Sequence, residues 1–360
     1  MRMQFRDHES GIALIIVMIV IVVLGILAGG FAYSMKVETT LARNSNHDAE
    51  LEWLGRSGVE LARYILAQSS SGIGGQFDAL NQKWAGGPGD TNDPLAEIPM
   101  KDYKLGSGSI SIEIKDLDRK FNINVADPPL LRQALQLVGV DAAEVSTIVD
   151  SIIDWRDPQD NPGLGGGSES YRTMTPPYDV KNGPLDDLSE LLLIRGITPA
   201  MYWGSGGGGL HAPVARRSAG LGTRKGFDEP AYVVGLVDVF TTLSSRMVNV
   251  NTASATALQI FPEIDENIAQ AITTGPTGRS GPDGVEGTID DTPFRNVAEL
   301  ARVPGMNAVP PQQLSRYFTV RSLIFEAHVD VQIDRVKRQY VALLRRNNPR
   351  DIQVLNLYWK

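Results

Sequence analysis

The sequence predicts an α+β fold, in which a long N-terminal helix packs on a small antiparallel sheet and a large α-helical domain is inserted into that body. Three observations lead to this prediction. The first 68 residues are dominated by an apolar run and by leucines at helical spacing. Alternating strand patterns occur before residue 120 and again after residue 314. The segment between them, 121–313, contains two related helix-like units.

The N-terminus combines a short polar segment with a long apolar run. Residues 1–11 are polar and end in Gly11, and residues 12–35 are uncharged and long enough to cross a bilayer as a helix. A secretory signal peptide is cut after its apolar region, whereas here we expect cleavage before it, between Gly11 and Ile12. A removable signal cut near Gly30, or an uncleaved membrane helix, is the alternative.

The orientation of the membrane segment and the extent of its helix can be predicted as well. Arg2 and Arg6 precede the apolar run, so the positive-inside tendency keeps this end cytoplasmic and places the chain after Met35 outside. Residues 36–68 lack proline and continue the helical pattern. One helix over 12–68 would be about 85 Å long at 1.5 Å per residue. A membrane helix followed by a separate soluble helix is the alternative.

The body on which this helix packs is predicted from two distant segments. Residues 69–120 begin with a loop rich in Gly, Ser, Asn and Pro and contain a strand at 107–115, where isoleucines alternate with polar residues. Residues 314–360 hold three more strand candidates. These are 317–330, 332–345 and 352–359. Together they form the expected antiparallel sheet.

The inserted segment contains an internal repeat. The sequence FNINVA at 121–126 recurs 127 positions later as VNVNTA at 248–253, and 188–197 recurs 109 positions later as 297–306. The order is kept while the spacing differs by 18 residues. We therefore expect two related, mostly α-helical units with loops of different length.

Composition and motifs argue against nucleic-acid binding and catalysis. The net charge is -8, with 34 Lys and Arg against 42 Asp and Glu, which disfavours a nucleic-acid partner. Turns like 188–197 occur in helix-hairpin-helix modules that hold a phosphate, but here we expect the glycine to end a helix in a left-handed conformation. The glycine run at 204–209 lacks a following Gly-Lys-Ser/Thr and indicates an exposed flexible loop. The chain has no cysteine and no metalloprotease or serine-hydrolase motif, so we predict that it is not an enzyme.

An acidic loop is the candidate metal site. Asp154, Asp157 and Asp160, interrupted by Pro and followed by a glycine run and Glu169, present several hard oxygens of the kind that Ca²⁺ binds. A solvated turn, or a pair of catalytic carboxylates, is the alternative. A second acidic stretch matches such a site less well. It carries Asp283, Glu286, Asp290 and Asp291.

Several motifs, taken together and in order, resemble the K-type minor pseudopilins of type II secretion systems. The Gly11 and Ile12 junction is similar to a type IV prepilin-like leader. In most pilins and pseudopilins the fifth mature residue is a glutamate, thought to neutralise the N-terminal amine of a neighbouring subunit; that position is Ile16 here, and its lack of a carboxylate is a mark of the K-type subunit. The other shared motifs are Asp154-Trp155-Arg156-Asp157, Glu169 with Tyr171, Pro176-Pro177-Tyr178, Asn182-Gly183-Pro184-Leu185, Glu190-Leu191-Leu192, Arg195-Gly196-Ile197 and VNVNTA at 248–253.

The resemblance covers nearly the whole chain and implies a pilin-like fold with a large helical insert that binds Ca²⁺. It implies leader cleavage by a prepilin peptidase, methylation, and a single-pass inner-membrane protein with its C-terminal domain in the periplasm. The implied partners are minor pseudopilins I and J, other pseudopilins and the inner-membrane assembly platform. We expect a subunit that caps the pseudopilus tip and helps to start its assembly, for export of folded proteins. A minor pilin of a type IV pilus or DNA-uptake system, or a membrane-anchored periplasmic protein of other function, is the alternative.

Overall fold

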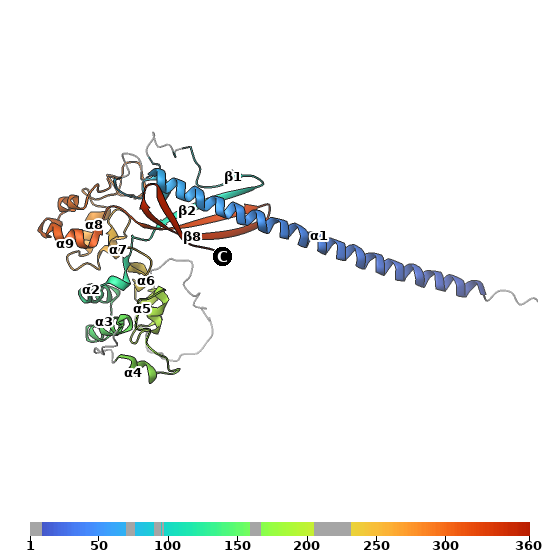
Figure 1. The fold of residues 1–360 in the computed structure, drawn as a ribbon, viewed down its shortest axis with the longest axis horizontal. Coiled ribbons are helices and arrows are strands. Elements are labelled where there is room, and N and C mark those ends of the chain that lie inside the picture. The colour runs from blue at the N-terminus through green and yellow to red at the C-terminus, as the bar shows by residue number, and fades with distance from the viewer. Residues whose placement is uncertain (1–8, 70–75, 90–94, 96, 159–166, 205–231) are drawn as a thin grey trace, which may run out of the picture.

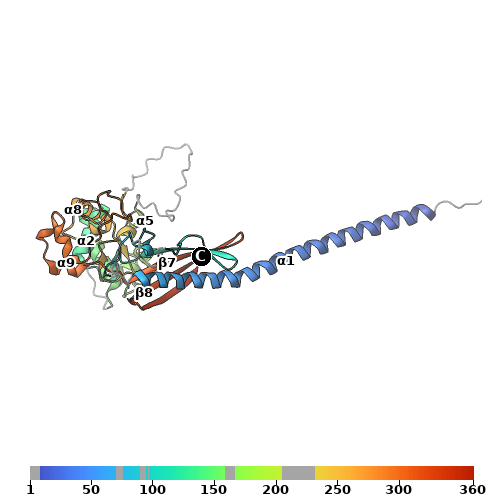
Figure 2. The same ribbon diagram turned by 90° about the horizontal axis from the view of Figure 1, so that it is seen from above.

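A computed structural model describes residues 9–69, 76–89, 95, 97–158, 167–204 and 232–360, and one long helix dominates its shape (Figure 1). Helix α1 runs unbroken over Glu9–Ser69. Its apolar first half projects away from the rest of the molecule and is exposed, whereas its second half lies along the sheet (Figure 2). Leu51, Ala62 and Ile65 on that second half are fully buried. The membrane segment and the following helix are therefore one continuous element.

Helix α1 packs on a five-stranded antiparallel sheet of order β1-β2-β7-β8-β9. The strands are β1 (Tyr103–Leu105), β2 (Gly108–Asp116), β7 (Ile324–Ile333), β8 (Val336–Asn348) and β9 (Asp351–Trp359). Strand β2 precedes the insert and β7 follows it, yet they pair along their length, with Ile112 opposite Val329. The sheet is thus closed across the insert, as the alternating patterns predict.

Two glycines let α1 approach this sheet closely. A Cβ at Gly55 would enter the ring of Tyr340 on β8, and a Cβ at Gly58 would collide with Val329 on β7. On the side of the body nearest the insert, Trp84 of the short helix η2 (Lys83–Ala85) packs edge-on against Phe325, with ring centroids 5.3 Å apart. These contacts close a separate apolar core between helix and sheet.

The insert lies at the end of the body opposite the free half of α1 (Figures 1 and 2). It is mostly helical, as expected, and has its own core. Its helices are η3 (Ile123–Val125), α2 (Pro128–Val138), α3 (Ala142–Arg156), α4 (Gly167–Arg172), η4 (Leu188–Leu193), α5 (Pro199–Trp203), α6 (Leu236–Val239), α7 (Ala255–Leu258), α8 (Glu266–Thr273), η5 (Val297–Arg302), η6 (Met306–Ala308) and α9 (Pro311–Tyr317). Two short parallel ladders join β3 (Phe121–Asn122) to β4 (Phe240–Thr241), and β5 (Val248–Asn249) to β6 (Phe318–Thr319).

The internal repeat is a structural duplication. In the first unit the Asn124 side chain donates to the carbonyl of Leu185 and accepts from its N–H, at 2.9 and 2.7 Å. In the second unit Asn251 makes the same pair of bonds to Phe294, each at 2.9 Å. Because these residues are separated by the same 127 and 109 positions as the repeated motifs, each unit folds around the same asparagine amide, which is half-buried in the first unit and buried in the second.

Each unit also contains an arginine and a glycine in equivalent roles. The guanidinium of Arg156 donates to two carbonyls of η3 and the residue after it, and Arg279 donates to the two equivalent carbonyls of the second unit. Gly196 and Gly305 both adopt left-handed conformations, with φ of 88° and 92°. The left-handed conformation predicted for the glycines is therefore confirmed, but the glycines do not end the helices. Helices η4 and η5 are 3-10 helices that end before them, at the extended cap residues Ile194 and Val303.

One expected strand needs correction, and most of the expected glycine loop lies outside the described residues. The strand expected from residue 317 begins only at Ile324, because Pro311–Tyr317 forms α9 and the next two residues pair with β5. The second unit of the insert accordingly extends beyond 313 to Thr319. Of the glycine run, only Gly204 lies within the described residues, where it ends α5.

Candidate functional site

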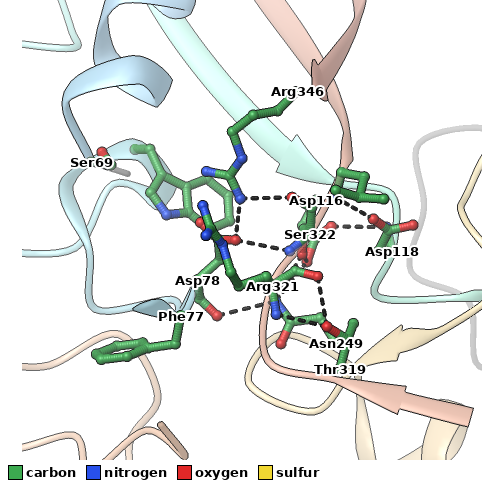
Figure 3. Close-up of polar contacts among 12 residues, drawn as sticks. Ser69, Phe77, Asp78, Asp116, Asp118, Asn249, Thr319, Arg321, Ser322 and Arg346 are labelled. Atoms are coloured by element: carbon green, nitrogen blue, oxygen red, sulfur yellow. Dashed lines mark hydrogen bonds and ion pairs between the residues drawn. The ribbon is translucent and has the colours of Figure 1, made fainter. Parts of the chain in front are cut away.

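The body and the insert meet at a closed cluster of polar side chains, shown in Figure 3. Three buried aspartates lie at its centre, with at most 3% of each residue exposed. The cluster consists of Asp78 from the loop after α1, Asp116 and Asp118 at the end of β2, Asn249 on β5, Ser322 before β7 and Arg346 on β8. We call these six residues the junction cluster.

Asp116 connects the two parts of the molecule directly. Its Oδ2 accepts from the hydroxyl of Ser322 at 2.5 Å and from the hydroxyl of Thr252 in the insert. Its Oδ1 accepts from the N–H of Asp118 at 2.8 Å. One carboxylate therefore ties the end of β2 both to the start of β7 and to the second unit of the insert.

Asp78 and Arg346 form the charged pair of the junction cluster. The Arg346 guanidinium donates to the Asp78 carboxylate and, at 2.6 Å, to the carbonyl of Ser322. Asp78 also accepts the N–H of Ser322 at 2.8 Å. Asn249 extends this network by donating to the Asp78 carbonyl at 3.1 Å and to the Ser322 hydroxyl at 2.8 Å. A buried ion pair of this kind is costly to break, since one partner alone would be an uncompensated charge.

Asp118 completes the cluster by accepting backbone N–H groups from both sides of the junction. Its carboxylate accepts from Ser245 in the insert at 2.5 Å and from Leu323 in the body at 2.6 Å. Burial raises the pKa of Asp118, while these N–H donors oppose the rise. The carboxylate thus fixes the direction in which the insert leaves the sheet.

Protonation of Asp116 is the chemistry that this arrangement makes available. Burial, the largest effect, and the neighbouring charge of Asp118 raise the pKa of Asp116 from 3.8 to about 7, against hydrogen bonds from Ser322 and Thr252 that lower it. The charge of Asp78 adds a smaller rise. Since the carboxylates are closed to solvent, the cluster is suited to holding two domains together and not to binding a substrate.

The first acidic loop lies on the insert, well apart in sequence from the junction. Asp154 is buried in the last turn of α3, Asp157 caps the C-terminus of that helix, and Glu169 is exposed on α4. Asp160 lies outside the described residues. The structure therefore places Asp154 and Asp157 within one turn of each other, at the helix end that leads into the predicted loop.

The second acidic loop is held by its own hydrogen bonds. Glu286 pairs with the buried Arg279 at 2.6 Å, and Asp291 accepts the N–H of Gly287 at 2.8 Å. Asp283 accepts the N–H of Val285, while Asp290 accepts the hydroxyl of Thr288, both at 2.7 Å. Each of these four carboxylates thus already has a donor in the fold.

Within the described ranges, no three His, Cys, Asp or Glu side chains are placed together to hold a metal ion. The first loop is described only up to residue 158 and again from residue 167, so that statement does not extend to Asp160. The calcium site accordingly stays a prediction.

Comparison with known proteins connects this architecture to one family. Residues 113–203, from β2 to α5, match the family model described as type II secretion system (T2SS), protein K. A type II secretion system protein K of Pseudomonas aeruginosa PAO1 is 26% identical over 206 residues, covering 53% of this chain and 58% of that protein. The protein K of Pectobacterium carotovorum subsp. carotovorum is 21% identical over 297 residues, covering 74% and 85%. The matched stretch and the named relatives both point to the type II secretion system protein K family.

The fold of a solved protein K complex agrees with this assignment. The crystal structure of the GspK-GspI-GspJ complex from enterotoxigenic Escherichia coli matches with a TM-score of 0.59 and 18% identity, over 89% of this chain and 99% of that chain. The predicted α+β, pilin-like fold with an inserted helical domain is thereby confirmed. The sequence matches to the first relatives extend over about three fifths of their length.

The N-terminal features predicted for this chain lie on α1. Among the described residues one helix is long and apolar enough to cross a membrane, with a mean hydropathy of 3.1 over an 18-residue stretch. Gly11 and Ile12 lie in the first turn of α1, and Ile16 is 55% exposed in the single chain. The expected cleavage would therefore fall in the first turn of α1 and leave its apolar run, from Ile12 onward, uncut.

Sequence reasoning missed the junction cluster. Its members come from five separate segments, and the only one that falls in a repeated motif is Asn249. The second unit has a leucine at 243 and a serine at 245, where the repeat spacing would place counterparts of Asp116 and Asp118. No local pattern therefore marks these aspartates as a site.

Proposed function

We propose that this chain is a minor pseudopilin that caps the tip of the type II secretion pseudopilus and helps to start its assembly. One observation carries the proposal. The helical insert lies across the end of the body that faces away from the free apolar half of α1 (Figures 1 and 2). A subunit whose helix enters a filament from above would thus present the insert at the end, where it blocks addition of another subunit.

The residue at Ile16 supports this position. A subunit inside a filament of apolar helices needs a carboxylate to neutralise the N-terminal amine of its neighbour, because an unpaired buried charge is expensive. Ile16 offers no carboxylate, and the side chains from Leu14 to Leu27 are about half exposed or more, with Gly25 the one position without a side chain. Such a surface suits contact with other apolar helices on its flanks. It does not suit contact with a subunit whose N-terminal amine must be neutralised at this position.

The partners and location follow from the family. The GspK of the solved complex is assembled with GspI and GspJ, and we propose the corresponding minor pseudopilins I and J as partners here. Other pseudopilins, the inner-membrane assembly platform and the prepilin peptidase complete the set, without nucleic acid. The proposed location is the inner membrane, with the body and insert in the periplasm.

Mass spectrometry of the N-terminus tests this function. The protein is recovered from membranes of cells with and without an active prepilin peptidase. Loss of residues 1–11 only when the peptidase is present is the expected result, followed by co-purification with the I and J partners. Gly11→Val should block cleavage by placing a branched side chain at the scissile bond, while the control Gly25→Val should be cleaved normally. An intact Met1 in all cells, or a cut near Gly30, would refute the proposal.

Calcium binding by the first acidic loop is a further part of the proposal. The second loop is the poorer candidate, because its carboxylates already accept hydrogen bonds and Glu286 is paired with Arg279. Asp154, Asp157, Asp160 and Glu169 would supply oxygen ligands. Calorimetric titration of the full chain with Ca²⁺ tests this: Asp157→Asn should weaken binding, and Asp283→Asn should leave it unchanged. Equal weakening by both variants, or no heat of binding, would refute it.

A further inference from the structure

The C-terminal strand β9 is an edge strand with an unusual surface. It is the last strand in the sheet order, and apart from Ile352 its large apolar residues are between 36% and 62% exposed. These are Val354, Leu355, Leu357, Tyr358 and Trp359. The eight residues 352–359 carry no charge, glycine or proline. An exposed edge of this composition favours association with another chain.

The opposite edge of the same sheet is protected. Strand β1 has only three residues. Lys101 and Asp102 precede it, and Lys104 lies within it. Short edge strands and charged side chains are the usual means of preventing edge contacts. Strand β1 is therefore a protected edge and β9 an apolar one, which indicates that β9 is kept apolar for a partner.

The register shows which side of β9 that partner covers. Trp359 lies opposite Tyr340, Leu357 opposite Ala342 and Val354 opposite Leu344, across the pairing of β8 and β9. Paired residues share a face, and these three residues of β8 are buried under α1. The side chains of Val354, Leu357 and Trp359 thus continue the α1-covered face beyond the helix itself. We call these three residues the β9 face.

Helix α1 forms a wall beside the β9 face. The Arg63 guanidinium donates to the carbonyl of Ile352 at 2.8 Å, which fixes the flank of α1 that faces β9. Trp53, Arg56 and Glu60 lie on the same flank, at spacings of three and four residues. Trp53 is 69% exposed, with the Arg56 guanidinium over its ring. The β9 face and this flank of α1 together form an aromatic and aliphatic surface with charged side chains at its edge.

We propose that the β9 face binds the long N-terminal helix of a second pseudopilin subunit, running parallel to α1. This inference rests on the proposed function, because the exposed apolar half of α1 needs neighbouring helices of the same kind. The two surfaces are continuous. From Leu41 to Arg63 a helix extends about 33 Å at 1.5 Å per residue, and the nine residues of β9 span about 30 Å. A helix that packs on the membrane half of α1 therefore reaches along the whole of β9 if it continues straight.

Site-directed cross-linking on the natural assembly tests the proposal. The chain has no cysteine, so single cysteines can be labelled with a benzophenone maleimide in membranes of cells that produce all the pseudopilins. Leu357→Cys and Trp359→Cys should cross-link to the N-terminal helix of another pseudopilin, identified by mass spectrometry. Tyr358→Cys, on the opposite face of the same strand, and Lys104→Cys on β1 should give at most one tenth of that product.

Other occupants give different patterns and would overturn the proposal. Addition of a partner strand to the edge would cross-link Tyr358→Cys as strongly as Leu357→Cys and would capture a strand. A second copy of this chain would give a product of twice its mass. No cross-link from either face, in cells where the leader is cleaved and the partners co-purify, would overturn this inference and leave the proposed function standing. An uncleaved leader with no co-purification would overturn both.

A charge at the β9 face supplies a second measurement. Leu357→Glu should reduce the amount of co-purified pseudopilin at least tenfold, since it places a carboxylate between two apolar surfaces. Asn356→Glu adds the same charge one residue away on the opposite face and should leave the amount unchanged. Because both positions are exposed, neither variant removes a buried contact of the fold. Equal effects of the two variants would contradict the proposal.

Discussion

Replacing Asp116 by asparagine should remove much of the pH dependence of this protein's stability. Asp116 has a pKa of about 7 in the folded chain and an unperturbed value of 3.8. Between these values the unfolded chain has lost the proton and the folded chain keeps it. The free energy of unfolding therefore falls as the pH rises from about 4 to about 7, and it levels off above pH 7.

The size of the effect follows from the pKa difference. Each pH unit within that window changes the free energy of unfolding by up to about 1.4 kcal/mol. Over about three units the loss is about 4 kcal/mol, without a discount for solvent screening because Asp116 is fully buried. The raised pKa of Asp118 adds a slope of the same sign, so Asp116→Asn should flatten the profile without making it level.

Urea unfolding of the full chain in detergent micelles measures this profile. Tryptophan fluorescence reports it well, because Trp84 is buried where α1 meets the sheet. The free energy of unfolding should be followed from pH 4.5 to pH 8 for the natural chain, Asp116→Asn and Glu113→Gln. Glu113 lies on the same strand but is exposed, so its variant should keep the natural slope. A level profile for the natural chain, or an unchanged slope in Asp116→Asn, would refute the reasoning.

Three further predictions concern the packing of the fold. Gly196→Ala should lower the free energy of unfolding by about 1–3 kcal/mol, because the residue is left-handed and a Cβ there would lie 2.7 Å from a side-chain carbon of α3. The control is Gly183→Ala, where a Cβ has room. Equal losses of stability in the two variants would contradict this explanation. Asn251→Ala should cost about 2–4 kcal/mol in urea unfolding, since both backbone groups of a buried residue lose their partner; a loss below 1 kcal/mol would show that water replaces the amide. Gly55→Leu should separate α1 from Tyr340, seen as faster proteolysis of the sheet; an unchanged cleavage rate would mean that the helix shifts without cost.

The sequence predicted the elements whose signals are local. The long helix follows from an apolar run and leucines without proline, and the sheet from alternating isoleucines, so both were found close to their true bounds. The repeat also followed from sequence, because two copies of the same bridging asparagine need the same neighbouring residues. The strand expected from residue 317 was misplaced, because Phe318 and Thr319 are apolar and β-branched yet pair within the insert.

By itself the sequence determined the class of the protein. It showed an apolar helix that follows a glycine, strands of alternating apolar residues on both sides of an insert, and a repeated helical unit within that insert. Only the tertiary structure decided where charge is buried and which edge of the sheet is open. Asp78, Asp116 and Arg346 are far apart in the chain, and their burial results from closing the sheet across the insert. The β9 face likewise exists only because the register places alternate residues beside α1. Both depend on which segments meet in space, and no local pattern of residues encodes that meeting.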